Sequence, residues 1–187
     1  MLRKAICNGA RGLQSRTANL LGALALALAD AQMEASRRAT GLGASACAAL
    51  VTIGQYPGLT IGGLSHVLGI SHSVAVRLVD SLSRAQLLER SAGAEDKRQV
   101  ALTLSSTGDA QMRVIFDQRH EQAEHAMAGL APSDQAALAA LLAHMLASMT
   151  HNRREADHIC RYCEEASCPQ DICPVALMAT KCDRGAS

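Results

Sequence analysis

The sequence predicts a mainly α-helical fold with one small β-hairpin, and three observations lead to that fold class. Helical spacing of apolar residues covers most of the chain. Residues 60–104 form an ordered series of a short helix, a tight turn, a longer helix and a hairpin. Aromatic residues make up only 2% of the chain, so the core must be packed from aliphatic side chains. This order predicts a winged helix-turn-helix core with long N- and C-terminal dimerisation helices and a small β-hairpin wing.

The first 40 residues divide into a basic segment and a helix. Residues 1–16 contain four basic side chains and no acidic one, and we expect a basic flexible N-terminal arm. Residues 17–40 are expected to form a dimerisation helix, in which Glu34 can pair with Arg38. The apolar run 20–29 also resembles a secretory signal. However, the run continues into a helical pattern and is too short to span a bilayer, which favours a cytoplasmic protein.

The helix-turn-helix is expected within a DNA-binding core at residues 44–104. A helix at 44–55 ends before Tyr56-Pro57-Gly58, and the next helix, 60–68, leads into the turn 69–71. The second helix is expected from His72 to about Leu87, with Ser71 as its N-cap. Its predicted buried face carries Val74, Leu78 and Leu82, with Ala75 and Val79 beside them. Its predicted polar face carries Ser73, Arg77, Asp80 and Arg84.

The hairpin is expected to place charged side chains at its tip. Its strands are predicted at 88–91 and 98–104, joined by a tip at 92–97. Val100, Leu102 and Leu104 alternate with other residues, as in a half-buried strand. An arginine such as Arg98 can enter a narrow minor groove, and Asp96 can hold its guanidinium group. A solvent-exposed charged turn is the alternative interpretation.

Two long helices are predicted after the hairpin, at 107–128 and from Pro132 to about Arg154. Proline is well suited to the first position of a helix, and Asp134 lies in the first turn. The second helix carries a broad apolar stripe that requires a partner. Together with the helix at 17–40, residues 107–155 are expected to form a dimer interface, with an intramolecular bundle as the alternative.

Residues 59–108 read LTIGGLSHVLGISHSVAVRLVDSLSRAQLLERSAGAEDKRQVALTLSSTG, which resembles the DNA-binding core of the MarR family of transcriptional regulators. The resemblance rests on Asp96 and Arg98 of the wing and on the run 102–104, and it extends over about residues 11–154. It implies an obligate homodimer, a roughly palindromic double-stranded DNA operator, and regulation by a small molecule or oxidant. By position, major-groove contacts fall on Ser71, His72, Ser73 and Arg77, and the minor-groove contact on Arg98. Arg84, Asp96 and Lys97 complete the set of candidate DNA-binding residues.

Residues 156–187 form a cysteine-rich tail that departs from this pattern. Five of the seven cysteines lie between residues 160 and 182. Cys160, Cys163, Cys168 and Cys173 follow the spacing C-x2-C-x4-C-x4-C, and short loops of this kind can close around one soft metal ion. Zinc and an iron–sulfur cluster both suit four thiolates, with His151 and His158 as reserve ligands. Reversible disulfide formation and unbound cysteines are the alternatives.

Charge and motifs favour a regulator over an enzyme. The net charge is only +1, so DNA affinity must come from placed contacts and not from a broad positive field. No arrangement of a nucleophile and a base is visible, and we expect no enzymatic activity and no membrane partner. The sequence therefore predicts a homodimeric DNA-binding transcriptional regulator, a repressor responsive to a small molecule, metal or redox signal. The alternative is a thiol-redox or iron–sulfur protein whose active part is the tail.

Overall fold

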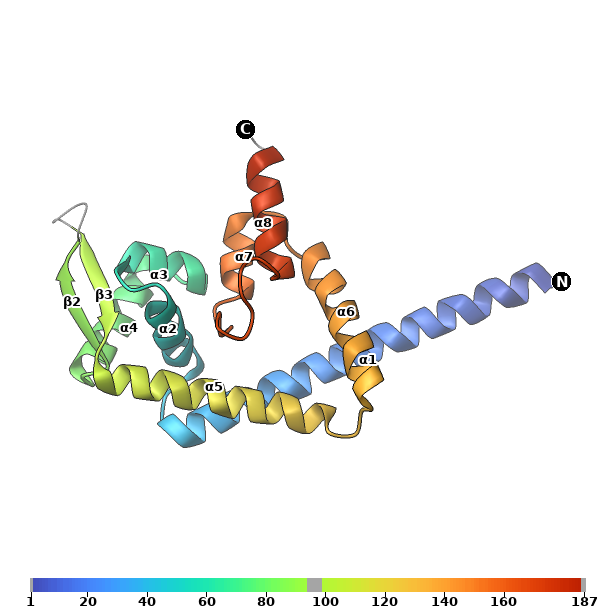
Figure 1. Ribbon diagram of the computed structural model, residues 1–187, viewed down its shortest axis with the longest axis horizontal. Coiled ribbons are helices and arrows are strands. Elements are labelled where there is room, and N and C mark those ends of the chain that lie inside the picture. The colour runs from blue at the N-terminus through green and yellow to red at the C-terminus, as the bar shows by residue number, and fades with distance from the viewer. Residues whose placement is uncertain (1, 94–98, 186–187) are drawn as a thin grey trace.

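The structure is a computed structural model that describes residues 2–93 and 99–185. It is mainly helical and contains a small antiparallel sheet of three strands, in the order β1-β3-β2 (Figure 1). The elements follow one another as α1 (Leu2–Thr40), α2 (Ala44–Gln55), β1 (Leu59–Thr60), α3 (Ile61–Leu68), α4 (His72–Arg84), β2 (Leu88–Ala92), β3 (Val100–Leu104), α5 (Ser106–Met127), α6 (Pro132–Ser148), α7 (Arg153–Ile159) and α8 (Pro174–Gly185). This confirms the predicted winged helix-turn-helix with long helices on either side.

Side-chain caps and one left-handed glycine define the helix-turn-helix. Thr60 accepts a hydrogen bond from the Gly63 amide and begins α3. Gly69, with a φ of 66°, ends α3 in the left-handed conformation that glycine adopts without strain. Ser71 then accepts from the Val74 amide and begins α4, as the sequence predicts. The two caps and the glycine turn therefore fix where each helix starts and stops.

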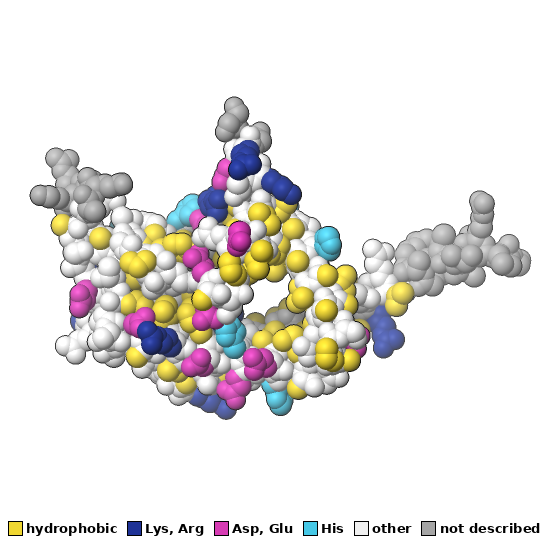
Figure 2. All heavy atoms as spheres, in the orientation of Figure 1, with side chains coloured by type: hydrophobic (Ala, Val, Ile, Leu, Met, Phe, Trp, Pro, Cys, Tyr) yellow, Lys and Arg dark blue, Asp and Glu magenta, His cyan; other side chains and the backbone are white. Residues whose placement is uncertain are grey.

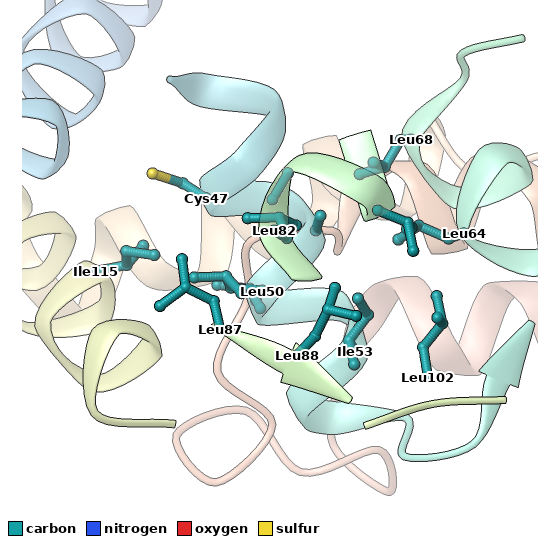
Figure 3. Packing of buried hydrophobic residues seen from close by; sticks show 14 of the residues in the cluster. Cys47, Leu50, Ile53, Leu64, Leu68, Leu82, Leu87, Leu88, Leu102 and Ile115 are labelled. Carbon is teal, nitrogen blue, oxygen red and sulfur yellow. The ribbon is translucent and has the colours of Figure 1, made fainter. Parts of the chain in front are cut away.

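The core lies where α2, α3, α4, the sheet and α5 meet (Figure 3). Helix α2 is its centre, since it is buried along most of its length and packs against α3, α4, β3 and α5. Cys47 lies in this core with 2% of its surface exposed, so it serves as a small packing residue. Ile115 from α5 closes the core on the side away from the wing.

Helix α1 packs along α5, and its N-terminal part extends beyond the rest of the molecule (Figure 1). Residues 2–16 belong to this helix, which corrects the expectation of a flexible arm at 1–16. Alanine, leucine, arginine and glutamine in this segment favour helix formation. The predicted pair of Glu34 with Arg38 is present at 2.7 Å, and Glu34 also pairs with Arg37 at 2.8 Å.

The structure corrects two further helix boundaries and adds one strand. Helix α4 ends at Arg84 and not near Leu87, because the chain turns through Gln86, which has a φ of 57°. The helix predicted from Pro132 to Arg154 breaks after Ser148, and a separate helix α7 begins at Arg153 with Asn152 as its cap. The sheet gains the short strand β1, whose Leu59 pairs with Leu102 of β3.

None of the described helices is by itself long and apolar enough to cross a bilayer. Helices α5 and α6 meet the length and composition limits only as a pair, with a bend of 118° between them.

The tail packs back onto the helix-turn-helix and onto α6. Helix α7 contacts α3, and α8 contacts both α7 and α6 (Figure 1). Hydrophobic side chains gather on α6 and on the neighbouring face of the tail (Figure 2). The tail is therefore part of the folded unit in the residues that the structure describes.

Candidate nucleic-acid interface

The N-terminal end of α4 presents a cluster of exposed polar side chains. Ser71, His72, Ser73 and Arg77 are all exposed. The Ser71 and Ser73 hydroxyl groups lie 3.2 Å apart, and the Nε of Arg77 donates to the backbone carbonyl of Ser73 at 3.3 Å. These contacts hold short donors and one guanidinium group at the helix end whose backbone N–H groups favour anions. The predicted major-groove residues therefore lie together on one surface.

The buried face of α4 differs from the predicted one. Ala75, Val79 and Leu82 are its buried residues, and Leu78 is partly buried. Val74, predicted to be buried, has 40% of its surface exposed. The pattern of every fourth residue drifts around a helix of 3.6 residues per turn, and the three- and four-residue steps 75, 79 and 82 follow the core more closely. Val74 consequently lies on the same exposed side as Ser73 and Arg77.

An ion pair joins α4 to the wing. The guanidinium group of Arg90 in β2 lies 2.5 Å from the carboxylate of Asp80 in α4. Arg84, one turn further along α4, donates to the backbone carbonyl of Asp80 at 3.4 Å. The sequence analysis did not single out Arg90 as a site residue, because ten residues and a turn separate it from Asp80. This ion pair connects the wing strand β2 to α4, the second helix of the helix-turn-helix.

The wing consists of β2 and β3 in antiparallel register, with Leu88 opposite Leu104 and Ala92 opposite Val100. Leu102 is fully buried and Leu104 is partly buried, whereas Val100 is 37% exposed because it lies toward the tip, beyond the core. The predicted tip residues Asp96, Lys97 and Arg98 lie outside the described residues, so their predicted contacts with DNA stay predictions.

A second candidate site lies in the tail. Cys160, Cys163, Cys168 and Cys173 line one cavity of about 60 Å³ together with Tyr56 and other residues. All six cysteines whose side chains are described are free thiols. Within residues 2–93 and 99–185, no group of three or more His, Cys, Asp and Glu side chains is arranged to hold one metal ion. The reserve ligands are engaged elsewhere, since His158 contacts the Val67 carbonyl and His151 contacts Glu155.

The thiols in this cavity influence one another. A hydrogen bond from Cys160 lowers the pKa of Cys163 to about 7, and the positive charges of Arg119 and Arg161 act in the same direction. The same hydrogen bond raises the pKa of Cys160, and burial adds to that rise. Burial and a hydrogen bond with Cys173 raise the pKa of Cys168 to about 11. Nearby positive charges therefore favour the thiolate form of Cys163, whereas burial and neighbouring thiols disfavour that of Cys160 and Cys168.

Hydrogen bonds connect this tail to the end of α2. The side chain of Gln55 donates to the Cys163 carbonyl at 2.6 Å and accepts from the Glu165 amide at 2.7 Å. The Tyr56 hydroxyl donates to the Glu165 carboxylate at 2.5 Å, and burial together with this carboxylate raises the pKa of Tyr56. The Tyr162 hydroxyl donates to the Ala44 carbonyl at the other end of α2. The cysteine loop is thus held against the central helix of the winged helix.

Residues 40–99 match the sequence profile of the MarR family. These residues span α2 to the wing, which is the segment in which the geometry above is found. This chain carries a MarR-family winged helix. No curated protein matches the chain.

Solved structures share the MarR-family fold at low sequence identity. The YusO protein from Bacillus subtilis is 19% identical with a TM-score of 0.62, and the match covers 72% of this chain and 94% of YusO. Streptococcus pneumoniae FabT, solved in complex with DNA, is 18% identical with a TM-score of 0.58, over 71% of this chain and 94% of FabT. A mutant of S. aureus MepR bound to an oligodeoxyribonucleotide is 18% identical with a TM-score of 0.54, over 72% of this chain and 98% of MepR. At these identities the likeness establishes the fold.

Proposed function

We propose that this protein is a sequence-specific DNA-binding transcriptional regulator. The observation that carries the proposal is the exposed N-terminal end of α4, where Ser71, His72, Ser73 and Arg77 lie on one surface beside a wing anchored by Arg90 and Asp80. A helix of this kind enters the major groove by its N-terminal end. The MarR-family match over the same residues, and the structures of FabT and MepR with DNA, support this function.

The test is a binding measurement on duplex DNA selected from a randomised pool by the full-length protein. Arg77→Ala is expected to weaken binding by about 5- to 150-fold at the selected sequence, which corresponds to the loss of one bidentate base contact of about 1–3 kcal/mol. The matched control is Arg113→Ala, since Arg113 is an exposed arginine of α5 paired with Asp109. Equal affinity of both variants and the unchanged protein would contradict the role of Arg77, and no binding to any duplex at low salt would refute the function.

We further propose that the protein acts as a homodimer through α1 and α6. Helix α6 has no buried residue within the described chain, and several of its apolar side chains are exposed, with Leu141 at 61% and Leu142 at 42%. Leu20 and Leu24 of α1 are likewise more than half exposed. Apolar surface of this extent on two long helices favours burial against a second copy. Two winged helices related by a twofold axis would read a palindromic operator.

The oligomeric state in solution tests the dimer. Leu141→Asp is expected to convert a dimer into a monomer in light scattering coupled to gel filtration, because a charge at the centre of an apolar interface is costly to bury. Val100→Asp serves as the control, since Val100 is an exposed apolar residue of the wing, far along the chain from α6. A monomeric unchanged protein would refute the dimer.

Repression under the control of a signal received by the tail completes the proposal. The tail contacts both ends of α2 through Gln55, Tyr56 and Ala44, so a change in its conformation would alter the support of the helix-turn-helix. A signal molecule that binds more tightly to a conformation unable to bind DNA weakens DNA binding. The size of the effect is set by the difference between its affinities for the two conformations of the protein. Transcription in vitro from a promoter that contains the selected duplex is expected to fall when the protein is added. A rise would overturn the repressor role.

A further inference from the structure

The four tail cysteines come from two short turns and line one cavity. Cys160 and Cys163 lie in the turn after α7, where the Cys163 amide donates to the Cys160 carbonyl at 2.8 Å. Cys168 and Cys173 bracket the loop before α8, and the Cys173 amide donates to the Pro169 carbonyl at 2.9 Å. Helices α7 and α8 pack together and bring the two turns to one place. The 60 Å³ cavity is lined by all four cysteines, and by Gln55 and Tyr56 from the end of α2.

The thiols come in two pairs along the chain, one pair from each turn. Cys160 and Cys163 lie three residues apart in one turn, and Cys168 and Cys173 flank the turn closed by the Cys173 amide on Pro169. No three potential ligands in the described part of the chain converge on a single position. A structural zinc ion requires four ligands in one tetrahedron with Zn–S bonds of about 2.3 Å. Each of the two turns instead offers two thiols to the cavity.

We propose that these four cysteines bind a [2Fe–2S] cluster, with Cys160 and Cys163 on one iron and Cys168 and Cys173 on the other. A [2Fe–2S] cluster takes four cysteine thiolates, two for each iron. Its two irons and two bridging sulfides need room between the thiol pairs. A cavity of 60 Å³ provides space for roughly four water-sized atoms, whereas a single ion bonded directly to four thiolates needs no such gap.

Charged groups of both signs surround the cavity, which is lined by Arg153, Asp157 and Glu165. Four thiolates and an oxidised [2Fe–2S] core together carry about two negative charges. The guanidinium groups of Arg119 and Arg161 act on Cys163, and Arg119 is held over the Tyr162 ring at 4.5 Å. Cys173 immediately precedes α8, and its carbonyl accepts from the Leu177 amide, so the positive end of that helix points toward the second pair.

The tail has a small core of its own, to which three of the four cysteines belong or against which they pack. The buried core of the tail consists of Ala156, Cys173, Val175 and Ala179, with Cys160 and Cys168 packed against it. A unit with so little buried apolar surface needs a metal, disulfides or docking onto a larger body for stability. The tail already docks onto α3 and α6, and a ligand held by the cysteines would add to that stabilisation.

Composition and spectroscopy of the full-length protein test the proposal. After anaerobic purification, or reconstitution of metal-free protein with ferrous iron and sulfide under a thiol reductant, we expect about two irons and two acid-labile sulfides per chain. We also expect visible absorption that bleaches on reduction and a paramagnetic signal in the reduced state. Cys160→Ser and Cys168→Ser are expected to lose iron and sulfide, whereas Cys182→Ser and Cys47→Ser retain them.

The assignment of ligands to each iron has its own test. Replacing Cys160 and Cys163 together by histidine is expected to raise the reduction potential, because two histidines on one iron produce this effect. Replacing Cys163 and Cys168 by histidine is the matched control, because these two residues bind different irons in our assignment. This variant is expected to show a smaller rise in reduction potential or to lose the cluster. An equal rise in both would overturn the pairing.

Three results would overturn the site itself. They are one zinc per chain without sulfide, about four irons per chain, and a chain that takes up neither iron nor zinc after reconstitution while all its tail thiols titrate freely or form disulfides. Circular dichroism identifies variants that fail to fold. If a variant fails to fold, the iron, sulfide and zinc content of the unchanged protein decides whether the site exists. These measurements do not depend on DNA binding, so the cluster and the proposed function can fail separately.

Discussion

Gly108→Ala tests whether the close packing of the wing against α5 is required for stability. A Cβ atom at Gly108 would lie 1.9 Å from the backbone oxygen of Leu87, whereas an ordinary contact needs at least 3.4 Å. Neither backbone can rotate away as a side chain would. The Ser105 amide also donates to this oxygen, and the Ser105 hydroxyl donates to the Gln86 carbonyl, so movement of α5 would strain two hydrogen bonds.

The expected net loss is about 2 kcal/mol. Overpacking costs about 1–3 kcal/mol, and a backbone partner places this site at the upper end of that range. Alanine regains about 1 kcal/mol over glycine as a helix former. For a chain of this length, the melting temperature is then expected to fall by about 4–8 °C.

Urea and thermal unfolding followed by circular dichroism measure this loss. Gly129→Ala is the matched control, because nothing lies within 4 Å of a Cβ atom built there. We expect Gly129→Ala to leave stability unchanged or to raise it slightly. The reasoning is refuted if Gly108→Ala melts with the unchanged protein, or if both variants lose the same stability.

Three further predictions concern the core, a helix cap and a surface carboxylate. Leu50→Ala removes a fully buried side chain of α2 and is expected to lower the free energy of unfolding, measured in urea, by about 2–5 kcal/mol. An unchanged free energy of unfolding would contradict the position of α2 at the centre of the core. Ser71→Ala removes the N-cap of α4 and is expected to cost about 1 kcal/mol, whereas exposed Ser81→Ala costs little; equal costs would contradict the cap. Hydrogen bonds from Arg37 and Arg38 lower the pKa of Glu34 from 4.5 to about 2. The stabilisation of the fold by this carboxylate is therefore present above pH 4.5 and is lost as the pH falls toward 2. An NMR titration of the Glu34 carboxyl with a midpoint near 4.5 would disprove this contact.

The local signals of the helix-turn-helix were readable from the sequence because they depend on neighbours in the chain. The cap at Ser71 and the turn at Gly69 require only the residues within one helical turn. The apolar pattern of α2 and the proline at the start of α6 are equally local. These signals were sufficient for the order of elements and for the family resemblance.

Tertiary packing decided which side of each element is buried. Val74 fits the apolar pattern of α4, yet it is exposed because the core contacts Ala75 and Val79 instead. The ion pair of Arg90 with Asp80 and the strand β1 both join segments that are distant in sequence. No local pattern encodes such contacts, since they exist only after the elements have packed.

The tail shows most clearly which properties follow from the sequence and which follow from tertiary packing. The sequence by itself determined that four closely spaced cysteines are available as soft metal ligands, because residue type and spacing are set by the covalent chain. Only the tertiary structure decided that all four line one cavity, and that this cavity lies against Gln55 and Tyr56 at the end of α2. The reason is physical: ligand chemistry belongs to individual side chains, whereas the distance between side chains depends on how α7 and α8 pack.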